Sequence, residues 1–140
     1  MKTSSKGIDF ITSNEGLKLE AYLCSSDKWT IGYGHTKNVK EGDVCTEQQA
    51  KDWLYEDVEV AEKAIIKHLP NLNQNQFDAL VSFVFNVGVG AFAGSTLLKK
   101  IKLNDTLLLR AEFAKWKYSK GSVSPGLVKR RKEEADLYFS

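Results

Sequence analysis

Residues 15–36 read EGLKLEAYLCSSDKWTIGYGHT, and this stretch decides the fold. Within it, apolar side chains recur at every second position on either side of the polar run SSDK at 25–28. A period of two, interrupted by a turn-forming run, is typical of two short strands joined as a β-hairpin. The alternating side chains are Leu19, Ala21 and Leu23 before the turn and Trp29, Ile31 and Tyr33 after it.

Helical patterns flank the hairpin on both sides. A first helix is predicted to begin at the serine pair 4–5 and to end near Glu15, because Gly16 suits the left-handed conformation that closes a helix. After the hairpin, the run TEQQ at 46–49 is a capping-box signature, and apolar residues follow at helical spacing until Pro70. A long helix is therefore predicted to connect the hairpin to the rest of the chain.

The second half of the chain is predicted to be helical throughout. Asn73 is the expected N-cap of a helix whose stretch FDALVSFVFNV is apolar nearly all round, as in a helix buried inside a bundle. Further helices are predicted at about 95–103, at 106–118 with Asp105 as N-cap, and at 125–138 with Ser124 as N-cap. The predicted fold class is α+β, mostly α. A single domain, 1–140, would consist of a hairpin lobe (about 15–60) and a helical lobe (about 61–140 plus the first helix) around a cleft.

Composition excludes several classes of protein. The chain of 140 residues is 42% hydrophobic, which is enough to fold around its own core without a metal or a disulfide. Its two widely spaced cysteines fit neither a disulfide scaffold nor a zinc motif, and the polar start, MKTSSKGIDF, predicts no cleaved signal peptide. No apolar run approaches the ~18 residues of a membrane span. The net charge of +2 is too mild to imply nucleic-acid binding, although residues 1–70 sum to −3 and residues 71–140 to +5.

Glu15 is the most informative residue for chemistry. At the C-terminal end of the first helix, unpaired carbonyl groups and the negative end of the helix dipole disfavour a second negative charge. The pKa of a carboxyl group in such a place is expected to rise, which suits a general acid at neutral pH. Taken alone, Glu15 is better explained as a solvated surface side chain that tolerates a poor position.

The hairpin adds two further candidates. If its loop is centred on Asp27, Cys24 and Thr30 face each other across it. An acid, a thiol and a hydroxyl group would then converge on one cleft beside the end of the first helix. The alternative for Cys24 is a half-buried packing residue.

The spacing Glu15, eight residues, Cys24, five residues, Thr30 belongs to a wider pattern. The stretch NEGLKLEAYLCSSDKWTIGYGHT resembles the phage-type lysozymes, the endolysins of glycoside hydrolase family 24, whose catalytic pattern is Glu, eight residues, Asp or Cys, five residues, Thr. Three further blocks resemble the same family in the same order: VKEGDVCTEQQAKDWL, NQFDALVSFVFNVGVGAF and PGLVKRRKEEADLY. The resemblance implies a lysozyme-like fold.

The resemblance also implies an activity, namely hydrolysis of the β-1,4 bond between N-acetylmuramic acid and N-acetylglucosamine in bacterial peptidoglycan, with no metal or cofactor. Glu15 would be the general acid, and Thr30 would help to hold the attacking water. Cys24 stands where many members have Asp, and its role as base, nucleophile or water-positioner stays open. The remaining implied site residues are Phe85 and Asn86 as cleft-lining residues and His35 as a structural tie between hairpin and helix. Independently of the resemblance, Arg130 or Arg131 could place a guanidinium near Glu15 and oppose the effect of the helix end; the alternative is that both belong to a solvated face of the last helix.

The same resemblance implies how such a protein works in the cell. It predicts a monomer that binds peptidoglycan glycan strands, binds no nucleic acid and does not insert stably into a membrane. An enzyme of this kind accumulates in the host cytoplasm and reaches the periplasm and cell wall through a holin-type pore, which leads to host cell lysis and phage release.

Three other hypotheses stay open at this point. Cys24 and His35 could form a thiol–imidazole dyad that attacks an amide or ester. Alternatively, the chain could be a non-catalytic peptidoglycan-binding module that keeps the fold. Finally, Cys24 and Cys45 could form a disulfide in an oxidising periplasm, which would mask Cys24.

Overall fold

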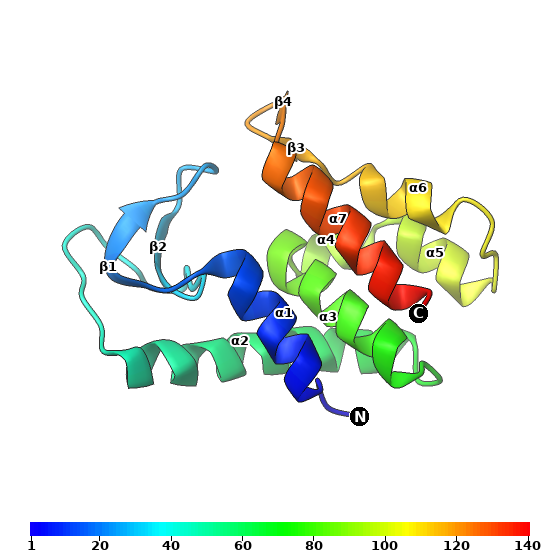
Figure 1. Ribbon diagram of the computed structural model, residues 1–140, viewed down its shortest axis with the longest axis horizontal. Helices are drawn as coiled ribbons and strands as arrows, with labels where there is room; N and C mark the ends of the chain where they lie inside the picture. Colours follow the sequence, from blue (N-terminus) through cyan, green and yellow to red (C-terminus); the bar gives the residue numbers. More distant parts are fainter.

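Most helices of the protein gather on one side of the molecule, and the first hairpin stands at the other (Figure 1). The computed structural model describes residues 1–140. The helices are α1 (Ser5–Glu15), α2 (Glu47–His68), α3 (Gln74–Val87), α4 (Val89–Ala93), α5 (Thr96–Lys102), α6 (Leu109–Ala114) and α7 (Pro125–Tyr138). The strands are β1 (Lys18–Leu23), β2 (Trp29–Gly32), β3 (Tyr118–Ser119) and β4 (Ser122–Val123), which pair as two antiparallel hairpins. The predicted fold class, α+β and mostly α, is confirmed.

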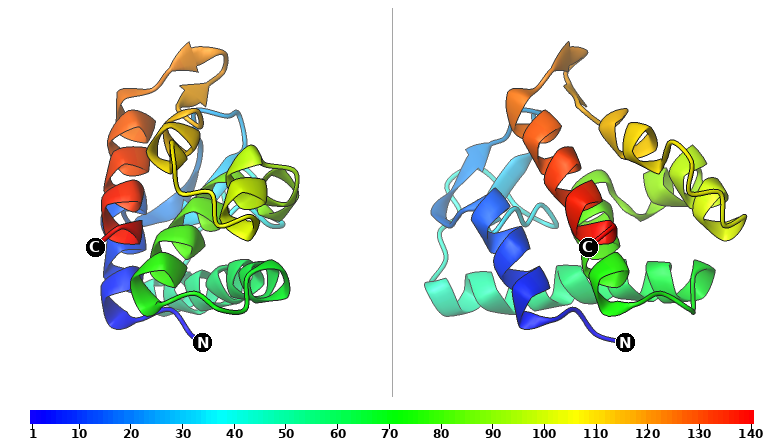
Figure 2. Two further views of the ribbon diagram at one scale, coloured as in Figure 1. Left: turned by 90° about the vertical axis from the view of Figure 1, so that its right-hand side faces the viewer. Right: turned by 45° about the vertical axis from the view of Figure 1, so that its right-hand side comes forward.

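Helix α3 is the centre of the core. Every residue from Phe77 to Val84 is buried, and the helix packs against α1, α2 and α7. The rotated views in Figure 2 show α7 lying along α3. Asn73 caps the helix through the backbone N–H of Gln76, as the sequence predicted. No helix of the protein has the length and apolar character needed to cross a membrane.

Helix α1 is fixed at both ends, and this fixes Glu15. At its start, the Ser4 side chain accepts a hydrogen bond from the backbone N–H of Gly7 and donates one to Asp78 of α3. A Cβ on Gly7 would lie 2.7 Å from the Asp78 carboxyl carbon, so the two helices are in close contact there. At its end, Gly16 has a φ of +71°, which a glycine adopts without strain. Glu15 is therefore the last residue of a rigidly placed helix.

The register of the first hairpin differs from the prediction. Thr30 pairs with Tyr22, so the expected pairing of Thr30 directly opposite Cys24 is wrong. The backbone N–H of Cys24 donates to the carbonyl of Lys28 at 3.0 Å, which closes a loop that is centred one residue earlier than Asp27. The shift in register comes from the conformation of Asp27. A turn begins at Cys24, and Asp27 follows it in the left-handed conformation, with a φ of +59°.

Helix α2 runs along the lower edge of the molecule, from below the first hairpin to the helices on the other side (Figure 1). Thr46 and Gln49 form the predicted capping box, and the helix ends just before Pro70. It contacts both β2 and α3. The predicted boundary between the lobes, near residue 60, thus falls inside one unbroken helix, and the division into lobes stays a prediction.

The predicted helix at 106–118 is much shorter in the structure. Leu108 has a φ of +67°, a left-handed conformation that a helix cannot contain, so α6 begins after it and Asp105 is not the N-cap. The chain beyond α6 forms the hairpin β3–β4, which the sequence analysis missed. Its turn residues Lys120 and Gly121 both have positive φ, as a tight two-residue hairpin turn requires.

Candidate active site

Glu15 lies on the wall of a groove of about 690 Å³ between the first hairpin and α7. The groove is lined from four parts of the chain. These are the end of α1 (Ser13, Asn14, Glu15), the hairpin turn (Ser25, Ser26), the end of α3 (Asn86, Val87), and the segment from Lys115 to Arg130. A substrate in this groove would contact both the hairpin and the helices.

The tips of the two hairpins meet at this groove. Lys120 Nζ lies 2.8 Å from Asp27 Oδ1, which joins the β3–β4 turn to the β1–β2 turn. Both side chains are exposed, so the pair contributes little to stability. Because Ser26 and Ser119, which line the groove, are their chain neighbours, the ion pair lies at the rim of the groove.

Arg130 is the arginine that contacts Glu15. Its Nη1 donates to Glu15 Oε2 at 2.7 Å, and the Glu15 side chain keeps only 17% of its surface exposed. The positive charge of the guanidinium offsets the negative end of the α1 dipole. Arg130 therefore fixes both the rotamer and the electrostatic surroundings of the carboxyl group.

Arg130 is held in turn by a fully buried carboxylate, Glu134. Arg130 Nε lies 3.4 Å from Glu134 Oε2, and Ser82 Oγ donates to the same oxygen at 2.6 Å. Arg131 Nε lies 2.9 Å from the other oxygen. Burial raises the pKa of Glu134, and the charges of Arg131 and Arg130 act in the opposite direction. Two arginines and two glutamates thus form a charge-balanced row that ends at Glu15.

Arg131 points away from Glu15 and holds Asn86 instead. Its Nη2 donates to Asn86 Oδ1 at 2.7 Å, and its guanidinium lies over the Phe83 ring at 5.1 Å. Burial lowers the pKa of Arg131 to about 10. Asn86, predicted to line the cleft, does line the groove with Glu15, whereas Phe85 lines a neighbouring pocket of about 280 Å³ with Gly34.

Cys24 and Thr30 are brought together diagonally across the hairpin, on the same face. Cys24 is opposite Lys28, and Thr30 is two residues further along the second strand. Burial is the largest single influence on the pKa of Cys24 and raises it. The backbone N–H of Lys28, the Thr30 side chain and the backbone of Ser26 outweigh burial, so the pKa of Cys24 is lowered overall.

Thr30 has one hydroxyl proton and two acceptors within reach. It is buried and donates to the Lys28 carbonyl at 2.9 Å, and its side chain is also within hydrogen-bond reach of Cys24. A single proton can serve only one of them at a time. When Cys24 is a neutral thiol, Thr30 can donate its proton to the Lys28 carbonyl. When Cys24 is a thiolate, Thr30 can donate the proton to the sulfur instead.

His35 is occupied by contacts with α2. Its Nδ1 lies 2.7 Å from Asp57 Oδ2, and its ring stacks on Trp53 at a centroid distance of 4.8 Å. The backbone of His35 also pairs with Ile31. No hydrogen bond joins His35 to Cys24. These contacts place His35 between the hairpin and α2, where the resemblance expected it.

Two residues at the site were missed in the sequence. A Cβ on Gly34 would lie 2.7 Å from Glu15 Oε1, and Gly34 has a φ of +74°. The glycines of the motif GYG were the available signal for this close approach. Tyr22, which pairs with Thr30, is the other: its pKa is raised by burial first, then by the negative charges of Glu15 and Cys24. The sequence carried no signal for Tyr22 beyond its place in the strand.

The proposed disulfide between Cys24 and Cys45 does not fit the structure, in which both thiols are free. The backbone N–H of Cys45 donates to the Leu19 carbonyl at 2.9 Å, so Cys45 lies beside the start of β1. Cys24 is five residues further along, a separation of roughly 15 Å. A disulfide tolerates at most ~7 Å between Cα atoms, so the masking hypothesis is wrong. The structure contains no cluster of three or more potential metal ligands.

A mostly helical α+β fold, with a glutamate at the end of the first helix facing a groove beside a hairpin, defines a lysozyme-like glycoside hydrolase. Comparisons with known proteins identify the family. Residues 12–134 match the family model described as phage lysozyme. The chain belongs to the phage lysozyme family, and it is a glycoside hydrolase of the endolysin type.

Relatives and solved structures agree with this assignment over the full chain. The endolysin of Acyrthosiphon pisum secondary endosymbiont phage 1 is 45% identical, covering 100% of this chain and 99% of the relative. The endolysin of Salmonella phage P22 is 39% identical with the same coverage. Among solved structures, the endolysin from Escherichia coli O157:H7 phage FAHEc1 is 39% identical with a TM-score of 0.86, covering 100% of this chain and 94% of that one. The predicted lysozyme-like fold is confirmed.

Proposed function

We propose that the protein cleaves the β-1,4 bond between N-acetylmuramic acid and N-acetylglucosamine within peptidoglycan strands, with Glu15, Cys24 and Thr30 as its catalytic residues. The observation that carries the proposal is the placement of Glu15. Its carboxyl group lies on the groove wall, is largely shielded from solvent and is held by Arg130. A general acid in glycoside hydrolysis needs this combination of access to substrate and fixed orientation.

Glu15 would transfer its proton to the glycosidic oxygen. Oε2 accepts the hydrogen bond from Arg130, so Oε1, on the side of Gly34, is the oxygen available to carry the proton. As the bond to the leaving sugar breaks, the proton moves to that sugar and Glu15 becomes a carboxylate. The guanidinium of Arg130 stabilises this charge as it forms, which favours the transition state over the bound substrate.

Cys24 and Thr30 would act on the attacking water. The lowered pKa of Cys24 increases the fraction of thiolate at neutral pH, and a thiolate can accept a proton from water as its oxygen adds to the anomeric carbon. Thr30 would hold the same water through its oxygen lone pairs, which stay free whether its proton goes to the Lys28 carbonyl or to the Cys24 thiolate. In this proposal Cys24 is the base, in the place where many family members have Asp.

Mass analysis of digested peptidoglycan tests the proposal. The wild-type chain should release fragments with new reducing muramic acid ends, and Glu15→Gln should release none while unfolding at the same urea concentration. Glu20→Gln, an exposed glutamate in β1, is the matched control and should keep full activity. Anhydro-muramic ends would instead indicate a transglycosylase, and either that result or full activity of Glu15→Gln would reject the mechanism.

The two alternative functions give different results in the same experiment. A thiol hydrolase that uses Cys24 and His35 would release free peptides, and Glu15→Gln would be harmless. The bonds of His35 to Asp57 and its stacking on Trp53 weigh against that dyad. A non-catalytic binding module would release nothing from peptidoglycan.

For the cell, we propose a monomer that binds peptidoglycan glycan strands and reaches them from the host cytoplasm through a holin-type pore. The support is the full-length similarity to endolysins of other phages. Expression of the chain in Escherichia coli should cause lysis only when a holin is co-expressed. Lysis of equal speed without the holin would reject this route. Sedimentation of the purified chain as a dimer would reject the monomer.

A further inference from the structure

The loop between α5 and α6 exposes three leucines that the hydrolase site does not use. Leu103, Leu107 and Leu108 keep 69%, 74% and 61% of their surface exposed, and they lie within six residues of each other. The positive φ of Leu108 is unusual for a leucine, which lacks the conformational freedom of glycine. A single exposed leucine needs no explanation, but three within one loop of six residues make that loop unusually apolar for an exposed segment.

Two lysines of α5 lie beside the first of these leucines. Leu103 shares the lining of a shallow groove of about 360 Å³ with Lys99 and Lys102. Lys99 has no ion-pair partner, and Lys102 Nζ contacts only the ring of His68, at 3.1 Å. These charges are not neutralised by carboxylates, so they are available to an anionic partner. We call the three leucines and these two lysines the α5–α6 surface.

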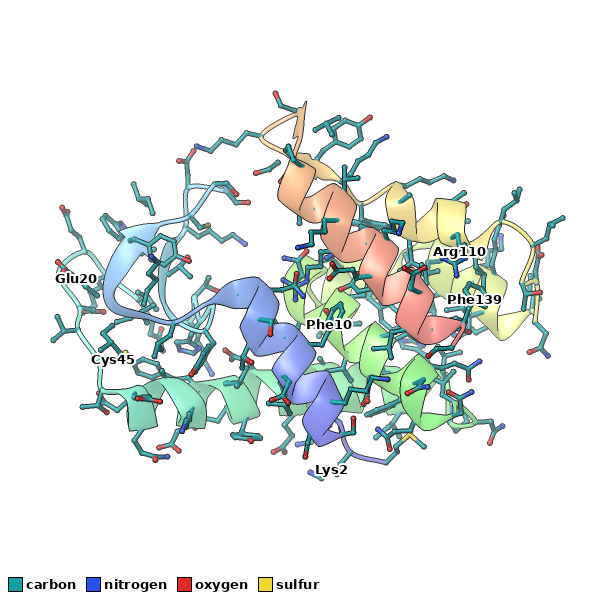
Figure 3. The ribbon with its side chains drawn as sticks, viewed as in Figure 1. Lys2, Phe10, Glu20, Cys45, Arg110 and Phe139 are labelled. Carbon is teal, nitrogen blue, oxygen red and sulfur yellow. The ribbon has the colours of Figure 1, made fainter.

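The α5–α6 surface lies at the end of the molecule opposite the β1–β2 hairpin (Figure 1). Arg110 and Phe139, labelled in Figure 3, lie near it at the same end. Arg110 is already paired with Asp136 at 2.6 Å and stacked on the Phe139 ring, so it adds little free charge. A partner bound at this end would leave the groove beside Glu15 open.

We propose that the α5–α6 surface docks on an anionic phospholipid bilayer. The leucines would enter the boundary between headgroups and acyl chains, and Lys99 and Lys102 would contact lipid phosphates. A second copy of this chain is a poorer occupant. A symmetric contact through the loop would bring four unpaired lysines together, and like charges repel. The proposal goes beyond hydrolysis: it adds a peripheral membrane contact to a chain whose groove faces elsewhere.

Co-sedimentation of the full chain with lipid vesicles tests this, because it requires no peptidoglycan. The chain should bind vesicles that contain phosphatidylglycerol far more strongly than vesicles of phosphatidylcholine alone. Leu103→Ser/Leu107→Ser should weaken binding about a hundredfold or more, since burial of each leucine contributes at least about tenfold. Lys99→Gln/Lys102→Gln should weaken it about fivefold per lysine, from roughly 1 kcal/mol per charge at the surface. All of these side chains are at the surface, so the variants should fold.

Matched controls change the same chemistry at the other end of the molecule. Val44→Ser removes an apolar side chain that is 75% exposed, and Lys37→Gln/Lys40→Gln removes two exposed charges from the same loop. Both should bind like the wild type. Absence of binding to phosphatidylglycerol vesicles would overturn the proposal, as would an equal loss in the control variants. A wild-type dimer that the leucine substitutions convert to monomer would assign the surface to self-association instead.

Discussion

Gly34 lies against Glu15 so closely that a Cβ on Gly34 would be 2.7 Å from Glu15 Oε1. On the other side of the carboxyl group, Arg130 binds Oε2 at 2.7 Å. The general acid of the proposed mechanism is thus held between a backbone that leaves no space and a guanidinium that fixes one oxygen. A side chain at position 34 would displace Glu15 from this position.

The substitution Gly34→Ala is therefore expected to reduce hydrolysis by about a hundredfold, since a displacement near 1 Å at a reacting group has effects of that size. Gly42→Ala is the matched control: Gly42 also has a positive φ, +87°, but a Cβ there meets nothing within 4 Å. Both variants should lose about 1–2 kcal/mol of unfolding free energy from backbone strain. Turbidity assays and urea unfolding measure the two effects, and equal activity of the two variants would contradict the contact.

The starts of four helices could be predicted because each depends on a few neighbouring residues. Ser4, Thr46, Asn73 and Ser124 each accept a hydrogen bond from the backbone N–H three residues later, and the sequence analysis identified all four positions. The resemblance to lysozymes supplied the rest, since it placed Glu15 and the hairpin in one fold. Local chemistry and a family pattern therefore sufficed for the architecture.

Finer features depended on tertiary packing or on a single backbone conformation. Arg130 and Arg131 are adjacent on α7 and point about 100° apart, so which one contacts Glu15 is set by the rotation of α7 against α3. The hairpin register depended on Asp27, which tolerates the left-handed conformation without requiring it. The short α6 depended likewise on Leu108, whose positive φ no propensity would suggest.

The buried row of charges predicts a loss of stability in two variants. Arg130→Met leaves the fully buried Glu134 with one arginine fewer, and it should lower the unfolding free energy by roughly 3–5 kcal/mol. The double variant Arg130→Met/Glu134→Met also takes the carboxylate away from the fully buried Arg131, so it should recover none of the lost stability. Neither should regain activity, because Glu15 lacks its partner in both. Urea unfolding and reducing-end release measure these effects, and a fully active double variant would refute the role of Arg130.

The pKa values of the two cysteines are expected to differ from that of an ordinary thiol in opposite directions. The pKa of Cys24 is lowered, because hydrogen bonds to sulfur outweigh burial, and burial raises the pKa of Cys45. Since the thiolate is the reactive form, Cys24 should reach its full rate of alkylation at a lower pH than Cys45. Iodoacetamide kinetics on Cys45→Ser and Cys24→Ser isolate each thiol in turn. The reverse order of midpoints would remove the support for Cys24 as a base.

The contact between Asp57 and His35 predicts a change in stability rather than in chemistry. Asp57→Asn replaces a charge-assisted hydrogen bond of 2.7 Å to a buried ring by a neutral one. The unfolding free energy should fall by about 1–3 kcal/mol. The turnover rate, measured at a temperature where the variant is fully folded, should stay within a few-fold of wild type, because Glu15, Cys24 and Thr30 keep their positions.

Asp52→Asn is the control on the same helix, since Asp52 is exposed and bonds only to the Gln48 side chain. It should change neither stability nor turnover. If Asp57→Asn instead abolished hydrolysis at unchanged stability, the Asp57–His35 pair would belong to the chemistry. The mechanism with a Cys24–His35 dyad would then be favoured over the mechanism with Glu15 as general acid. Such a dyad needs an aspartate that orients the histidine.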